Sequence, residues 1–160
     1  FTCGSSTQGA SPSNIDEIEM TTIQTKGSCV IFGELDGQGT AATALIGSLN
    51  CWGGAASQTR GIIFSGMSSP NASRNIIEYL TLSTFGNSQD FGDMLTSGGS
   101  GGSTATGNQI RAVVKTTSAN VGNVLEQVTI ATTGNATDFG DLNTGRRSYG
   151  SVCDSHGGLG

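Results

Sequence analysis

Residues 125–142 of this chain read LEQVTIATTGNATDFGDL, and two earlier stretches repeat the same pattern. Residues 77–94 read IEYLTLSTFGNSQDFGDM, and residues 18–35 read IEMTTIQTKGSCVIFGEL. The three copies align without a gap and share a glutamate, a threonine, an aliphatic residue and a glycine before a closing Phe-Gly-acid triplet. Self-similarity at a spacing of about 50 residues is typical of repeat architectures. The chain is therefore predicted to contain three repeated units.

The first half of each copy is predicted to form a strand that ends in a tight turn. In residues 79–84 and 127–132, Leu, Val or Ile alternates with Thr, Ser or Ala, and this period of two indicates a strand with one buried face. A Gly-Asn pair follows in the second and third copies, and Gly27-Ser28 follows in the first. Glycine and asparagine tolerate the positive φ that tight turns require.

The repeated apolar positions are the expected core. The glycine after each phenylalanine leaves room for a neighbouring backbone or for a bend. The expected core residues are one aliphatic residue and one phenylalanine from each copy: Ile23, Leu82, Ile130, Phe32, Phe91 and Phe139.

Composition favours an all-β fold of short strands. Only 12% of the 160 residues are charged, 26 are glycine, and no convincing amphipathic helix occurs. Residues 60–66 and 111–115 read as further buried strands. We therefore expect three repeated antiparallel β-sheet units, arranged as propeller-like blades or as a stack of small sheets.

The whole chain, 1–160, is expected to form a single repeat domain. Phe1 matches the repeat phase of Phe64, so the units are expected to run approximately over 1–63, 64–114 and 115–160. The Gly/Ser-rich residues 96–107 resemble a flexible linker, but they fall inside a unit and are interpreted as an exposed loop at its rim.

The acids at the end of the second and third copies are candidate calcium ligands. Asp90 and Asp93 flank one Phe-Gly pair, and Asp138 and Asp141 flank the other. Calcium takes six to eight oxygen ligands, more than these pairs supply. Turn capping by solvated acids is the preferred interpretation, so no cofactor or metal is expected unless calcium binds here.

Four cysteines admit disulfides without a metal-binding spacing. Bridges Cys3–Cys153 and Cys29–Cys51 would join the ends of the chain and close the first unit, although four cysteines allow three pairings. Free buried thiols are an equal alternative if the chain folds in a reducing compartment.

Catalysis is not expected. His156 is the single histidine, and neighbouring Asp154 and Ser155 do not make a catalytic triad by adjacency. One glutamate recurs in every copy and is interpreted as a structural residue of the repeat. No glycosidase pair is assigned.

Charge and hydropathy exclude two classes of partner. The net charge is −5 and the basic residues are scattered, which argues against nucleic-acid binding. No apolar run is long enough to span a bilayer. Trp52 and Tyr149 are the aromatic residues that could contact a ligand such as a glycan; core packing is the favoured interpretation of Trp52.

The stretch 127–142 resembles the repeat of kelch-like virion structural proteins of tailed bacteriophages, notably aquatic and marine ones. The arginine-containing residues 143–150 and the strand 60–64 are similar to segments that accompany this repeat. The resemblance is strong over the third copy, good over the second and weak over the first. It implies propeller-like β-sheet units and a role on the outer virion or tail fibre.

The resulting expectation is a structural component of a bacteriophage particle, in its tail, fibre or capsid surface, that acts through subunit assembly. A homo-oligomer and other virion proteins are the expected partners, and the virion is the expected location. The alternative is an adhesin or lectin-like module that attaches to glycans of the host surface. Exposure of Trp52 would favour the second role, and its burial between units the first.

Overall fold

All regular structure in the described part of the chain is β-strand. The computed structural model describes residues 2–3, 17–22, 24–35, 50–68, 72–98, 104–116, 122–145 and 150–153. The strands are β1 (Thr2–Cys3), β2 (Glu17–Met20), β3 (Val30–Glu34), β4 (Asn50–Ala56), β5 (Arg60–Ser68), β6 (Ala72–Thr81), β7 (Gln89–Gly98), β8 (Thr104–Gly107), β9 (Arg111–Lys115), β10 (Val124–Thr129) and β11 (Thr137–Asp141). The expectation of an all-β fold is confirmed.

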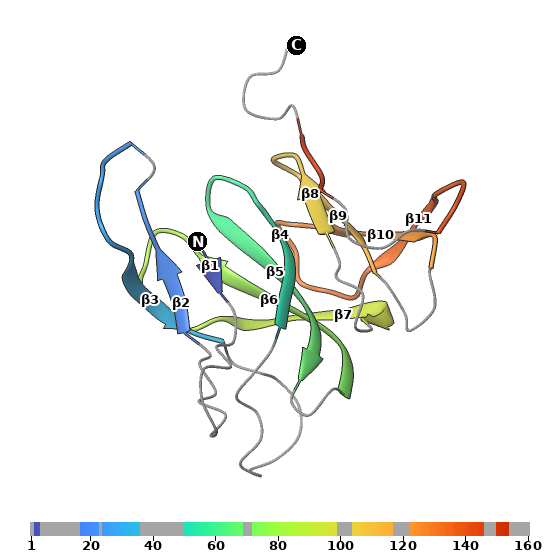
Figure 1. Ribbon diagram of the computed structural model, residues 1–160, viewed down its shortest axis with the longest axis horizontal. Helices are drawn as coiled ribbons and strands as arrows, with labels where there is room; N and C mark the ends of the chain where they lie inside the picture. Colours follow the sequence, from blue (N-terminus) through green and yellow to red (C-terminus); the bar gives the residue numbers. More distant parts are fainter. Residues whose placement is uncertain are drawn as a thin grey trace.

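The strands form three antiparallel sheets that follow one another along the chain (Figure 1). Sheet A has the order β1-β2-β3, sheet B the order β4-β5-β6-β7, and sheet C the order β8-β9-β10-β11. Each sheet holds one copy of the repeat as the hairpin β2-β3, β6-β7 or β10-β11. All three hairpins are irregular at the same repeat position, next to the shared glutamate. The repeat in sequence is thus a repeat in strand register, including its bulge.

The boundaries between the sheets do not coincide with the expected boundaries between the units. The expected boundary at 63/64 falls inside β5, and the boundary at 114/115 falls inside β9. Pairing also places Cys3 opposite Ile18 in the way that Phe64 lies opposite Ile77, so β1 is the counterpart of β5. Phe1, two residues earlier, therefore does not share the repeat phase of Phe64.

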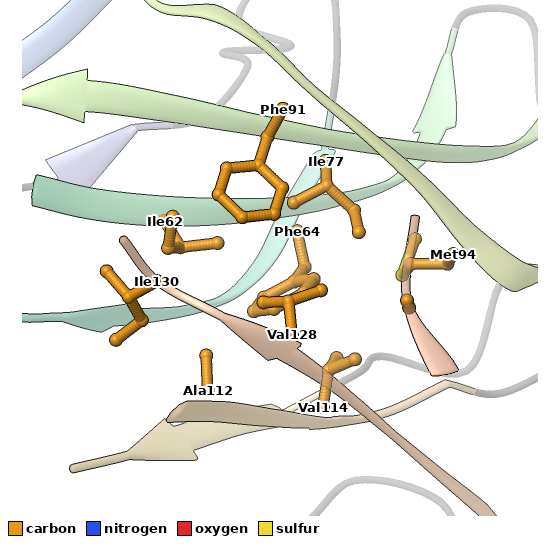
Figure 2. Packing of buried hydrophobic residues seen from close by; sticks show 10 residues of the cluster. Ile62, Phe64, Ile77, Phe91, Met94, Ala112, Val114, Val128 and Ile130 are labelled. Carbon is orange, nitrogen blue, oxygen red and sulfur yellow. The ribbon is translucent and has the colours of Figure 1, made fainter. Parts of the chain in front are cut away.

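Sheet B is the middle layer of the described structure, and both of its faces carry buried apolar side chains. Phe64 and Ile77 pack toward sheet C in one core cluster, while Ile63 and Leu80 pack toward sheet A in a second cluster with Ile18. Figure 2 shows the first cluster between the strands of sheets B and C. A strand that is buried on both faces reads as a continuous apolar run. This arrangement explains the uninterrupted run at the start of β5.

The expected rim loop is shorter than its composition suggests. β7 continues to Gly98 and β8 begins at Thr104, so both ends of the stretch 96–107 belong to strands. Backbone pairing of β8 with β9 does not require apolar side chains. A strand can therefore form in this Gly/Ser/Thr-rich segment without an apolar pattern that would reveal it in the sequence.

Candidate assembly interface

The turn of the second copy lies against the last strand of the first sheet. The backbone N–H of Gly86 donates to the carbonyl of Phe32 at 3.0 Å, and the N–H of Ser88 donates to the carbonyl of Glu34 at 2.9 Å. The side-chain Oδ1 of Asn87 accepts from the backbone N–H of Glu34 at 3.1 Å. Three hydrogen bonds therefore join sheet B to the backbone of sheet A.

The turn of the third copy makes the same contact with the second sheet. Gly134 N–H donates to the carbonyl of Phe91 at 2.7 Å, and Ala136 N–H donates to the carbonyl of Asp93 at 2.8 Å. Asn135 Oδ1 accepts from Asp93 N–H at 3.0 Å. Because the same three bonds occur at both junctions, the Gly-Asn turn and the Phe-Gly-acid strand are two halves of one interface.

The glycine of the Phe-Gly-acid triplet is required by this close approach. A Cβ atom on Gly33 would lie 2.0 Å from the carbonyl oxygen of Gly86, and one on Gly92 would lie 2.5 Å from that of Gly134. Both distances are far below van der Waals contact, so only glycine fits. The corresponding Gly140 of sheet C meets nothing within 4 Å. Room for a neighbouring backbone, as the sequence predicts, is therefore used at two of the three copies.

The exposure of the repeated phenylalanines also separates the first two copies from the third. Phe32 and Phe91 are only 4% and 2% exposed, whereas Phe139 is 48% exposed. The expectation that Phe139 is a core residue is therefore wrong, because no turn of a further unit covers it in the described structure. Ile130 is buried and Leu82 packs at the edge of the core as expected. Ile23 lies outside the described residues.

The repeated glutamate forms a second part of the interface. Glu126 is fully buried, and its Oε2 accepts from the N–H of Leu95 at 2.8 Å. Its Oε1 accepts from the N–H of Thr96 at 3.1 Å and from the hydroxyls of Thr96 and Thr116 at 2.5 and 3.1 Å. A residue of sheet C thus satisfies backbone donors at the end of β7 in sheet B. Buried charge is tolerated when it accepts several hydrogen bonds in this way.

Burial of the other two glutamates depends on their place in the stack. Glu78, in the middle sheet, is also fully buried, whereas Glu19 in the first sheet is exposed. The glutamate is thus buried, as its predicted structural role requires, only in the two sheets that follow another sheet in the described structure. The repeat pattern does not indicate which groups the glutamate binds, because these groups lie in a different copy.

Arg60 joins sheets B and C at the end of β5. Its guanidinium lies 4.4 Å from the ring centroid of Tyr79 and donates to the carbonyl of Ile130 at 3.0 Å. Stacking on an aromatic ring while a carbonyl is bound is typical of arginine. Arg111, its counterpart in sheet C, is exposed.

The candidate calcium ligands do not come together in the described part of the chain. Asp90, Asp93, Asp138 and Asp141 are all exposed, and no group of three or more His, Cys, Asp or Glu side chains is placed to hold a metal ion among the described residues. The N–H of Gly140 donates to Asp138 Oδ1 at 3.2 Å, a local contact of the turn-capping kind.

The remaining expected residues are only partly described. Cys29 carries an exposed free thiol, so the structure does not contain a Cys29–Cys51 bridge, and Cys153 is exposed. The pairing of Cys3 with Cys153 stays a prediction. The side chain of Trp52, on β4, and all of Tyr149 lie outside what is described. No helix in the described ranges is long and apolar enough to cross a membrane.

Replacing Asn135 by alanine tests the side-chain part of the junction. The variant loses the bond to Asp93 N–H, and we expect the free energy of unfolding to fall by about 0.5–1.5 kcal/mol, the usual contribution of one hydrogen bond. Urea denaturation followed by circular dichroism measures this change. Asn143→Ala, at an exposed residue after β11, is the matched control and should leave the midpoint unchanged.

No protein-family model matches this chain, and comparison with curated proteins found no significant relative.

Proposed function

We propose that the protein is a structural subunit of a bacteriophage particle, in a tail, fibre or capsid-surface component, and that it acts through assembly. The observation that carries this proposal is the interface between successive sheets, which is formed twice within the chain by the same backbone hydrogen bonds. Because the same interface recurs, a further unit can be added through the same type of contact. The virion location rests on the resemblance of residues 127–142 to phage repeat proteins.

The exposed half-interfaces at the two ends of the stack support assembly with further units. Phe139 and Gly140 in sheet C have the sequence of the contact strand, but no turn among the described residues covers them. The face-to-face packing of successive sheets is also how blades pack in a propeller, and a propeller closes with about four to eight blades. A ring of blades would therefore need units from more than one copy, together with homo-oligomers or other virion proteins as partners.

The solution mass of the purified chain tests the proposal. Size-exclusion chromatography with light scattering, with and without reductant, is expected to show a discrete oligomer or a filament over a range of concentrations. Reductant controls for bridges through the exposed thiol of Cys29. A strictly monomeric chain at all concentrations would contradict a role in assembly.

A glycan-binding module is the second candidate, and one feature favours it. An open pocket of about 270 Å³ lies at the junction of sheets B and C, and its lining includes Arg111, Gln127 and Asn135. Amide and guanidinium groups can donate hydrogen bonds to sugar hydroxyls, and amide oxygens can accept them. Screening the protein on a glycan array tests this role, and binding that is lost in Gln127→Ala would support it.

A further inference from the structure

We propose that copies of this protein associate head to tail, with the turn around Gly27 of one copy bound to the strand edge Phe139–Asp141 of the next. This inference rests on the proposed assembly function and names the two surfaces that carry it. It follows from continuity with an interface that the chain already forms twice between its own sheets.

The acceptor surface is the outer end of sheet C, and its parts correspond to those of an occupied junction. Phe139, Gly140 and Asp141 repeat the positions of Phe91, Gly92 and Asp93, which receive the turn of the third copy. The ring of Phe139 is 48% exposed, and the space above Gly140 is open. This edge could therefore receive a turn in the way that β7 does, but no turn lies over it in the described structure.

The donor surface is the turn of the first copy at the opposite end of the stack. Gly27 and Cys29 occupy the positions of Gly86 and Ser88, whose N–H groups donate to sheet A. Both residues are exposed, and nothing lies within 4 Å of the Cβ position of Gly27. Glu19, the counterpart of Glu126, is also exposed on this side. The donor half of the interface is therefore present, and none of the described residues covers it.

Lys26 gives this contact a feature that the internal junctions lack. At the junction of sheets A and B, the ring of Phe85 lies 5.3 Å from that of Phe32. The equivalent pair between two copies is Lys26 and Phe139. A lysine ammonium group over an aromatic ring is attractive, so the substitution suits an aqueous contact between subunits.

The contact between copies is weaker than the internal ones, for two reasons. Ser28 stands where the other turns carry Asn87 and Asn135, and its shorter side chain cannot make their hydrogen bond to the strand backbone. Thr21 stands where Leu80 fills the core between sheets A and B. Association is therefore reversible and depends on protein concentration.

Ser28→Asn is the first test, because it restores the missing amide on an exposed turn. The additional hydrogen bond is expected to tighten self-association by about threefold to tenfold in sedimentation velocity under reductant. Gln24→Asn, which shortens an existing amide side chain on the same exposed loop away from the contact, should leave the association constant unchanged.

A mixing experiment tests the polarity of the contact. Phe139→Ser removes the acceptor ring, and Cys29→Pro removes the donor N–H, while Cys29→Ser keeps that N–H as a control. Circular dichroism establishes that each variant folds. Each of the first two is expected to be monomeric alone, whereas their mixture forms a one-to-one dimer through the intact halves.

The outcomes separate this inference from the proposed function. A wild-type oligomer whose mass is unaffected by Ser28→Asn and Phe139→Ser would overturn the head-to-tail contact and leave assembly through another surface standing. Two monomeric variants that do not combine would also overturn it. A wild-type chain that is monomeric at every concentration would contradict the assembly function itself.

Discussion

Replacing Gly92 by alanine is expected to lower the free energy of unfolding by about 3–5 kcal/mol. The new methyl group would lie 2.5 Å from the carbonyl oxygen of Gly134, which forces the turn of the third copy away from sheet B. Displacing that turn weakens three hydrogen bonds, each contributing about 0.5–1.5 kcal/mol. The φ of +147° adds a backbone cost of about 1–3 kcal/mol for a residue other than glycine. Urea denaturation measures the total.

Gly140→Ala is the matched control for this variant. Gly140 has the same place in the motif and a similar φ of +139°, but no atom lies within 4 Å of its Cβ position. Its substitution should therefore cost only the backbone part, about 1–3 kcal/mol. Equal destabilisation by the two substitutions would show that the close approach of the turn does not contribute to stability.

Replacing Glu126 by glutamine is expected to destabilise the protein by about 2–4 kcal/mol. The two carboxylate oxygens accept two backbone N–H groups and two hydroxyls, and all four donors converge on a fully buried group. The amide NH₂ of glutamine cannot accept, so at least one buried donor loses its partner. Hydrogen bonds to a charged acceptor contribute about 1.5–3 kcal/mol each.

Glu19→Gln provides the comparison at the same repeat position. Glu19 is exposed in sheet A, so the change should stay within about 0.5 kcal/mol at concentrations where the chain is monomeric. Both variants are measured by urea denaturation. A midpoint for Glu126→Gln as high as that of Glu19→Gln would mean that the buried carboxylate is not what satisfies the end of β7.

The repeat pattern predicts the hairpins of this protein well because their physics is local. Alternation of Leu, Val or Ile with small polar residues specifies the strand, and the Gly-Asn pair specifies the turn that ends it. Strands β5 and β9 are also recognisable, because burial on one or both faces gives short apolar runs. The all-β class follows from these elements together.

What lies between the copies could not be predicted in the same way. Asn135 is explained by turn geometry alone until Asp93, in another sheet, is seen to donate to it. The expected burial of Phe139 fails for the same reason, since identical residues are covered or exposed according to whether a turn lies over them. β8 is not recognisable from the sequence, because its residues resemble a linker and it is held by backbone pairing with β9. A one-dimensional pattern indicates that a contact residue recurs, but it does not identify the group that it meets.

The arrangement of sheet B between two neighbours has a consequence for how such a chain can change in length through gene duplication. Each junction joins the turn, the glutamate and one apolar face of a sheet to the strand edge and the facing core of its neighbour, so a duplicated segment that carries a whole unit would meet a matching surface on either side. Insertion of part of a unit would instead leave a turn or an edge uncovered. Whole-unit gains and losses are therefore the length changes that this architecture tolerates, and variation in unit number among descendants of one gene requires no new packing solution.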